Sequence, residues 1–142
     1  MEDRASGFRL LEHPSDVGIE AFAPTLGEAF AAAGRGLMSI ILDPGAVDPC
    51  EAREISLQAS DVEQLLVRWL SEILYLYDGG GFASREFAVD RIGPAGLHAL
   101  VRGERFDPQR HSTRMDVKAV TYHQLAVRSG AEGWVARVFL DI

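Results

Sequence analysis

Two spacings of apolar residues alternate along this chain, and they predict which segments form strands and which form helices. Strands are indicated where apolar and polar residues alternate, or where β-branched and aromatic residues gather between turn residues. The segments with this pattern are residues 8–12, 17–23, 54–59, 87–92, 97–103, 115–120, 122–128 and 134–141.

The first of two predicted helices begins after Thr25. Thr25 and Glu28 have the spacing of a capping box, in which the hydroxyl accepts a bond from a first-turn amide and the carboxylate reaches back. Apolar residues then recur every three or four positions from Leu26 to Ile41, which places them on one helical face. The sequence Asp-Pro-Gly at 43–45 ends this helix.

The second predicted helix carries a wide apolar stripe that runs from Val62 to Tyr77. Ser60 and Glu63 form a second capping box at its start, and the three glycines at 79–81 end it. The stripe includes Trp69, which we expect in the core rather than at a functional site, because aromatic side chains contribute much of the area that proteins bury.

The order of these elements predicts the fold class. Two strands, a helix, a strand and a second helix come first, about five strands follow, and regular strand–helix–strand alternation is absent from the pattern. This order is typical of an α+β fold in which two amphipathic helices pack on a largely antiparallel β-sheet. A length of 142 residues fits a single domain over residues 1–142.

Composition narrows the classes of function. The net charge of −7 disfavours a protein that binds DNA or RNA directly, because such binding requires a basic surface. The single cysteine, Cys50, excludes an intrachain disulfide and suits a reducing compartment. The first residues lack the pattern of a signal peptide and the apolar stretches are too short to span a bilayer, so we expect a cytoplasmic protein without membrane contact.

The strand predicted at 134–141 stays apolar almost to the last residue, so we expect this end of the chain to lie inside a sheet. That arrangement would hold the Asp141 side chain and the α-carboxylate of Ile142 close together. Two adjacent anionic groups repel each other unless a cation or a basic partner lies between them. We therefore expect half of a site here, with hard oxygen ligands that suit calcium, magnesium or manganese rather than structural zinc.

Two further segments contain candidate functional residues. The sequence His-Pro-Ser-Asp-Val-Gly at 13–18 forms a turn between two strands, in which the simpler interpretation is that Asp16 caps the turn. The strand predicted at 115–120 carries Lys118, the only lysine of the chain, which is either a functional cation or half of a surface ion pair. His123 lies near a bend and is more simply a hydrogen-bonded structural residue than a ligand.

Several longer motifs follow one another along the chain. They are His-x-x-Asp-Val-Gly at 13–18, Leu-Gly-Glu-Ala-Phe at 26–30, Leu-Leu-Val-Arg-Trp-Leu-Ser-Glu-Ile-Leu-Tyr-Leu-Tyr-Asp at 65–78, Gly-Glu-Arg-Phe-Asp-Pro-Gln-Arg-His at 103–111, Val-Lys-Ala-Val-Thr-Tyr-His at 117–123 and the final Asp-Ile. In this order they resemble the archease family over essentially the whole chain. The family's usual His-Thr-Ala-Asp is His-Pro-Ser-Asp here, which stiffens the turn and keeps the aspartate.

The resemblance implies a protein cofactor rather than an enzyme. Archeases assist the RtcB-type RNA ligase, which joins RNA ends in tRNA splicing and RNA repair with GTP and divalent metal. The cofactor promotes guanylylation of the ligase's active-site histidine and allows multiple turnover. Contact with RNA would be indirect, through the ligase, and the family fold is a small α+β domain.

The resemblance also implies a metal site and a set of partner contacts. Family members carry a divalent cation, typically Ca²⁺ in structures, with Mg²⁺ or Mn²⁺ as alternatives. Its ligands carried over to this sequence are Asp16, Asp141 and Ile142, which makes Asp16 an expected ligand. The residues expected to contact the ligase are His13, Lys118 and His123.

Two other functions are alternatives to the ligase cofactor. One is a chaperone-like interaction module whose divalent cation is structural. The other is a metal-dependent hydrolase that uses Asp16 and Asp141, with His13 or His123 as a base, although no motif for generating a nucleophile accompanies these carboxylates.

Overall fold

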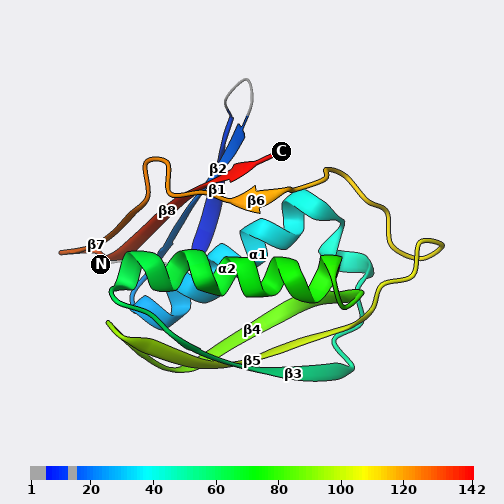
Figure 1. The fold of residues 1–142 in the computed structure, drawn as a ribbon, viewed down its shortest axis with the longest axis horizontal. Helices are drawn as coiled ribbons and strands as arrows, with labels where there is room; N and C mark the ends of the chain where they lie inside the picture. Colours follow the sequence, from blue (N-terminus) through cyan, green and yellow to red (C-terminus); the bar gives the residue numbers. More distant parts are fainter. Residues whose placement is uncertain (1–5, 13–15) are drawn as a thin grey trace.

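The chain folds into two α-helices and eight strands in the described residues, 6–12 and 16–142, of the computed structural model (Figure 1). In chain order these are β1 (Gly7–Glu12), β2 (Asp16–Ala23), α1 (Leu26–Ile41), β3 (Glu51–Gln58), α2 (Val62–Asp78), β4 (Phe82–Gly93), β5 (Gly96–Arg105), β6 (Ala119–Val120), β7 (Ala126–Gly130) and β8 (Gly133–Asp141), with a short 3-10 helix at Pro44–Ala46. The predicted α+β class with two helices and antiparallel strands is confirmed.

The strands form two antiparallel sheets. The five-stranded sheet has the order β1-β2-β8-β6, and β7 also pairs with β8; the three-stranded sheet has the order β3-β5-β4. Figure 1 shows the two helices between these sheets, and α1 contacts strands of both. Each sheet therefore turns one face toward the helices and its outer face toward solvent.

The capping box predicted at the start of α1 is formed only in part. Thr25 is the N-cap, and its hydroxyl accepts a hydrogen bond from the Glu28 amide at 3.2 Å. The Glu28 carboxylate accepts a bond from the Ser6 hydroxyl at 3.1 Å instead of reaching back to Thr25. Further along, a Cβ on Gly36 would lie 2.9 Å from Ile19 Cγ2, so glycine allows α1 to pack with its backbone close to β2.

The N-terminus of α2 differs from the prediction by one residue. Asp61 is the N-cap, and its carboxylate accepts a hydrogen bond from the Gln64 amide at 2.8 Å. The Gln64 side chain in turn accepts one from the Ser60 amide at 2.7 Å. The predicted capping pair of Ser60 and Glu63 is therefore wrong, because aspartate caps as well as serine and glutamine can replace glutamate three residues later.

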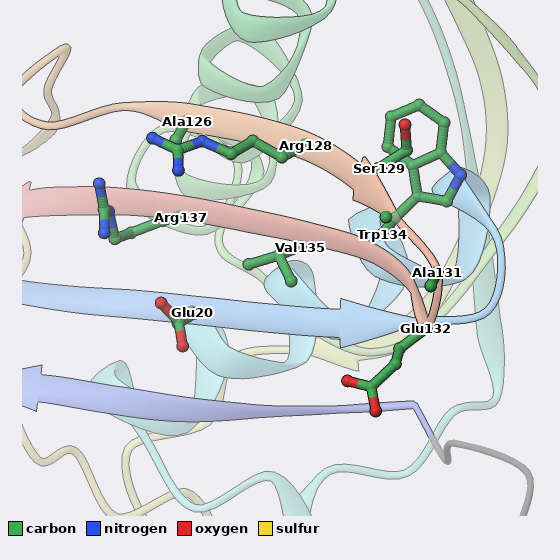
Figure 2. A pocket seen from close by; sticks show the side chains of 11 residues that line it. Glu20, Ala126, Arg128, Ser129, Ala131, Glu132, Trp134, Val135 and Arg137 are labelled. Carbon is green, nitrogen blue, oxygen red and sulfur yellow. The ribbon is translucent and has the colours of Figure 1, made fainter.

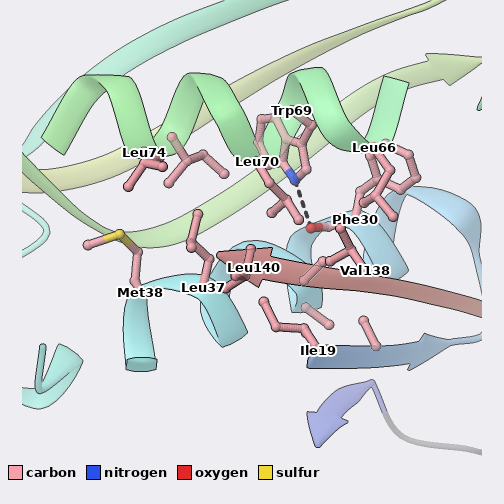
Figure 3. Packing of buried hydrophobic residues seen from close by; sticks show 14 of the residues in the cluster. Ile19, Phe30, Leu37, Met38, Leu66, Trp69, Leu70, Leu74, Val138 and Leu140 are labelled. Carbon is pink, nitrogen blue, oxygen red and sulfur yellow. Dashed lines mark hydrogen bonds between the residues drawn. The ribbon is translucent and has the colours of Figure 1, made fainter. Parts of the chain in front are cut away.

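The core lies between the sheets, and Trp69 of α2 is fully buried in it, as predicted (Figure 3). Its indole Nε1 donates a hydrogen bond to the Phe30 carbonyl oxygen of α1 at 2.8 Å. Phe87 of β4 meets the indole edge-on, with ring centroids 6.1 Å apart. Trp69 thus joins both helices to the three-stranded sheet.

In the described part of the chain, neither helix has the length and apolar character needed to cross a membrane.

One predicted strand is mostly absent. Of residues 115–120, only Ala119–Val120 forms a strand, and the predicted strand at 122–128 begins later, at Ala126. The preceding segment is tied to the end of α1 instead of to a neighbouring strand, because the Arg114 amide donates to the Ile41 carbonyl oxygen at 2.7 Å. The alternation that suggested a strand reflects the burial of Val117, so placing Lys118 on that strand is wrong.

Candidate functional site

Asp16 and Asp141 lie directly opposite each other, where β2 begins and β8 ends. Directly opposed residues of an antiparallel pair point to the same face, with Cβ atoms about 4.5–5.5 Å apart. That face is the outer one, because the adjacent residues Val17 and Leu140 are buried in the core. Asp16 is half-buried and Asp141 is exposed. The sheet therefore brings together two carboxylates from distant parts of the sequence.

The strand that carries Asp141 is held on both sides up to its last residues. On the side away from β2, Ala119 pairs with Asp141, and the Lys118 amide donates to the Asp141 carbonyl oxygen at 2.8 Å. The Ile142 side chain packs against the hydrophobic core. These contacts hold the backbone at Asp141 in place, and they anchor Ile142, the residue that follows it.

His123 packs against an aromatic ring on the outer face of the same sheet. Its ring meets Phe139 edge-on, with centroids 5.7 Å apart and planes at 69°. Thr121 holds this segment: its hydroxyl donates to the Phe139 carbonyl oxygen at 3.0 Å and accepts from the His123 amide at 3.2 Å. Gly18, opposite Phe139, leaves room for the ring, since a Cβ there would lie 2.7 Å from it.

The structure thus unites half of the predicted site residues. Of the three expected ligands, Asp16 and Asp141 face each other at one corner of the sheet, and Ile142 follows Asp141 in the chain with its side chain packed on the core. Lys118 reaches this corner through its backbone and has an exposed side chain, and His123 lies beside Phe139. His13 lies outside the described residues.

The donor chemistry of this corner fits a divalent cation. The side-chain carboxylates of Asp16 and Asp141 offer hard oxygens only, which suit Ca²⁺, Mg²⁺ or Mn²⁺. Asp16 and Asp141 lie on paired strands whose backbone is already ordered. Binding of a cation would therefore cost little conformational entropy.

A buried charged network at Glu104 was missed by the sequence analysis. Both terminal nitrogens of the Arg110 guanidinium donate to the Glu104 carboxylate, each at 2.9 Å, and the Asp48 amide donates at 2.8 Å. His111 Nδ1 accepts a bond from the Asp107 amide, so Nε2 carries the proton that His111 donates to Glu104 at 2.9 Å. These bonds, led by that from Arg110, lower the pKa of Glu104 from 4.5 to about 2.

The same network argues against a metal site at Glu104. The side chains of Asp48, Cys50 and Glu104 place ligand atoms within 4.8 Å of one another. A cation there would have to displace the guanidinium of Arg110, so we assign this cluster a structural role.

A second charged cluster lies on the three-stranded sheet. His98 of β5 is hydrogen-bonded to Asp90 of β4 through Nδ1 at 2.6 Å and to Glu54 of β3 through Nε2 at 3.0 Å. The bonds to Glu54 and Asp90 raise the pKa of His98, and the bond from His98 lowers the pKa of Asp90. His98 therefore links all three strands of this sheet.

Sequence and fold both match proteins of one family. Residues 8–142 match the Archease protein family (MTH1598/TM1083). Protein archease of Methanosarcina acetivorans is 37% identical over 146 residues, which cover 100% of both chains. Protein archease of Saccharolobus islandicus is 39% identical over 137 residues, covering 95% of this chain and 98% of the relative. The solution structure of Methanobacterium thermoautotrophicum Protein 1598 matches with a TM-score of 0.81 and 28% identity, covering 96% of this chain and 99% of the other.

Proposed function

This chain belongs to the archease family, and from this premise we propose that it is a protein cofactor of an RtcB-type RNA ligase. In this role it is not itself an enzyme. It promotes guanylylation of the ligase histidine and multiple turnover in tRNA splicing and RNA repair. Its net charge of −7 supports an indirect relation to RNA, through the ligase, because phosphate backbones repel an acidic surface.

The observation that carries this proposal is the pairing of Asp16 with Asp141. The two paired strands hold both carboxylates on one face, so the acidic corner is presented to a partner in a single arrangement. A ligase conformation with positive charge opposite this corner binds more tightly than one without it. The cofactor then acts by shifting the ligase toward the conformation that it binds more tightly.

As the alternative to direct pairing with positive charge on the ligase, we propose that the residues at this corner hold a divalent cation. Asp16, Asp141 and the α-carboxylate of Ile142 would bind it, with Ca²⁺ as the first candidate and Mg²⁺ or Mn²⁺ as alternatives. When bound, the ion would neutralise carboxylates that otherwise repel one another. The paired strands would hold these groups in position in the protein without the ion, so the site would be preorganised.

Three residues near this corner are proposed as ligase contacts. Lys118 has an exposed side chain, and its backbone is fixed by the Asp141 carbonyl oxygen, so its ammonium extends from a rigid point. His123 is also exposed while its ring rests against Phe139. His13 is carried over from the family motif alone.

RNA ligation by an RtcB-type ligase, with GTP and Mn²⁺ and with substrate in excess, tests the proposal. We expect this protein to convert single turnover into multiple turnover. Asp141→Ala should abolish that stimulation with little effect on folding, because the side chain is exposed at the end of β8. The matched control is Glu86→Ala on the other sheet, which is also exposed and should stimulate normally.

The two possible failures are distinguishable. If the unaltered protein changes neither ligation nor ligase guanylylation, the cofactor proposal is wrong. If Asp141→Ala stimulates as well as the unaltered protein, the cofactor role stands and the role of the carboxylate pair is wrong.

A further inference from the structure

Arginine side chains gather on the outer face of the five-stranded sheet, toward the end of β8 that is remote from Asp141. The pairing register places Arg137 of β8 between Glu20 of β2 and Ala126 of β7. Arg128 is two residues after Ala126, so it lies on the same face and diagonal to Arg137. Arg9 of β1 stands directly opposite Glu20 on its other side.

These arginines differ in how many of their guanidinium N–H groups are hydrogen-bonded within the protein. Arg9 is paired with Glu20, to which its Nε donates at 2.7 Å. Arg137 donates through Nε to the Gln124 carbonyl oxygen at 3.1 Å, which leaves its two terminal nitrogens. Within residues 6–12 and 16–142, the side chain of Arg128 has no hydrogen bond or ion pair. The guanidinium groups of Arg128 and Arg137, on adjacent strands, therefore have N–H groups that no acceptor among the described residues occupies.

A cavity of about 440 Å³ lies over this part of the sheet (Figure 2). Val135 and Ala126 belong to its lining, and Arg128 and Arg137 extend in the same direction along their strands. The volume is in the range of small-molecule sites, about 300–1,000 Å³. Two carboxylates also line it, but Glu20 is bound by Arg9 and Glu132 is not free either.

We propose that this cavity binds a phosphomonoester, with the phosphate between Arg128 and Arg137 and the remainder of the ligand over Val135 and Ala126. Like charges placed diagonally on one sheet face repel each other, and an anion between them removes that cost. The net charge of −7 already favours solubility, so solubility does not explain why two arginines lie on one face without a carboxylate partner. This inference does not rest on the ligase proposal.

The arrangement fits a phosphate better than a carboxylate. One guanidinium already satisfies both oxygens of a carboxylate through two parallel bonds. A phosphomonoester offers three terminal oxygens and about −1.5 to −2 charges at neutral pH, which matches two guanidinium groups. The phosphate could come from a free nucleotide or from the phosphorylated end of an RNA, and the acidity of the chain as a whole favours the free nucleotide.

NMR titration of ¹⁵N-labelled protein tests the site. Adenosine 5′-monophosphate should shift the amides of Val135 and Ala126 saturably, and adenosine, which lacks the phosphate, should not. Arg128→Gln and Arg137→Gln should each weaken binding about tenfold or more, since each removes charge-assisted hydrogen bonds. The matched control is Arg102→Gln, an exposed arginine on the outer face of the other sheet, which should leave binding unchanged.

Arg128→Gln is the cleaner of the two variants because the side chain has no partner to lose in the described residues. A 5′-phosphorylated RNA trinucleotide that binds more tightly than the monophosphate identifies RNA as the source of the phosphate, and weaker binding identifies the free nucleotide. The proposal is overturned by the absence of a saturable shift, by equal shifts with adenosine, or by equal weakening in Arg102→Gln.

Discussion

The indole of Trp69 donates its hydrogen bond to the backbone carbonyl of Phe30, so a single bond of 2.8 Å joins α2 to α1 inside the core. Trp69→Phe removes this donor, so that the Phe30 carbonyl oxygen keeps only its bond within α1, and it opens a small cavity. We expect the free energy of unfolding to fall by about 2–4 kcal/mol. Urea denaturation followed by circular dichroism measures this loss.

Trp134 provides the comparison for that experiment, because it is only half-buried. Trp134→Phe should lower the free energy of unfolding by less than Trp69→Phe does. Equal losses in the two variants would show that the bond to Phe30 contributes little beyond the bulk of the ring.

Calcium should raise the thermal stability of this protein through the corner formed by Asp16 and Asp141. A ligand that binds only the folded state adds about 2.7 kcal/mol at a concentration one hundred times its Kd. Differential scanning calorimetry should therefore show a Tm that rises with Ca²⁺ in the unaltered protein and in Glu86→Gln. In Asp141→Asn the rise should be largely lost, and an unchanged rise would place the ion elsewhere.

His98 should make stability depend on pH in the neutral to alkaline range. Its pKa in the folded state is raised by the bonds to Glu54 and Asp90, so the charged form is favoured on folding. The contribution is complete below the unfolded pKa of 6.5 and is lost as pH rises through the higher folded value. His98→Gln should therefore flatten the dependence of the unfolding free energy on pH in the range above 6.5. Urea denaturation at a series of pH values measures this, and an unchanged dependence in the variant would contradict the role of His98.

Glu104 should govern part of the acid sensitivity. Its pKa is lowered from 4.5 to about 2, so its contribution is present above 4.5 and is lost as pH falls through about 2. Glu104→Gln should lower the Tm at neutral pH and reduce the further fall of Tm in acid. Thermal melts at a series of pH values, with Glu86→Gln alongside, measure this. A Glu104→Gln protein that matches Glu86→Gln at every pH would contradict the role of the network.

Elements whose signals are local could be predicted from the sequence. The cap at Thr25, the apolar stripe around Trp69 and the strand that ends at Asp141 each depend on residues a few positions apart. The error at residues 115–118 has a physical reason: one buried valine, Val117, gives the same alternation whether it lies in a strand or in an irregular segment that covers the core.

Features that depend on register could not be predicted. Local residue patterns suggested only half of a site at Asp141, and Asp16 was added to it by the resemblance to the archease family; the pairing of β2 with β8 sets the two residues opposite each other. The Glu104 network joins Asp48 to Arg110 across three segments, and no local pattern reports such a contact. The neighbouring positions of Arg128 and Arg137 likewise follow from the β7–β8 register.

The central position of β8 has a consequence for the synthesis of this protein. β8 follows all the other strands in sequence, yet it pairs with β2, β6 and β7. During translation β1 and β2 are therefore synthesised long before β8, and until then the edge of β2 that β8 will occupy has no partner strand. A nascent chain interrupted before β8 lacks both the completed sheet and Asp141, so the acidic corner forms only in molecules that the ribosome has extended through this last strand.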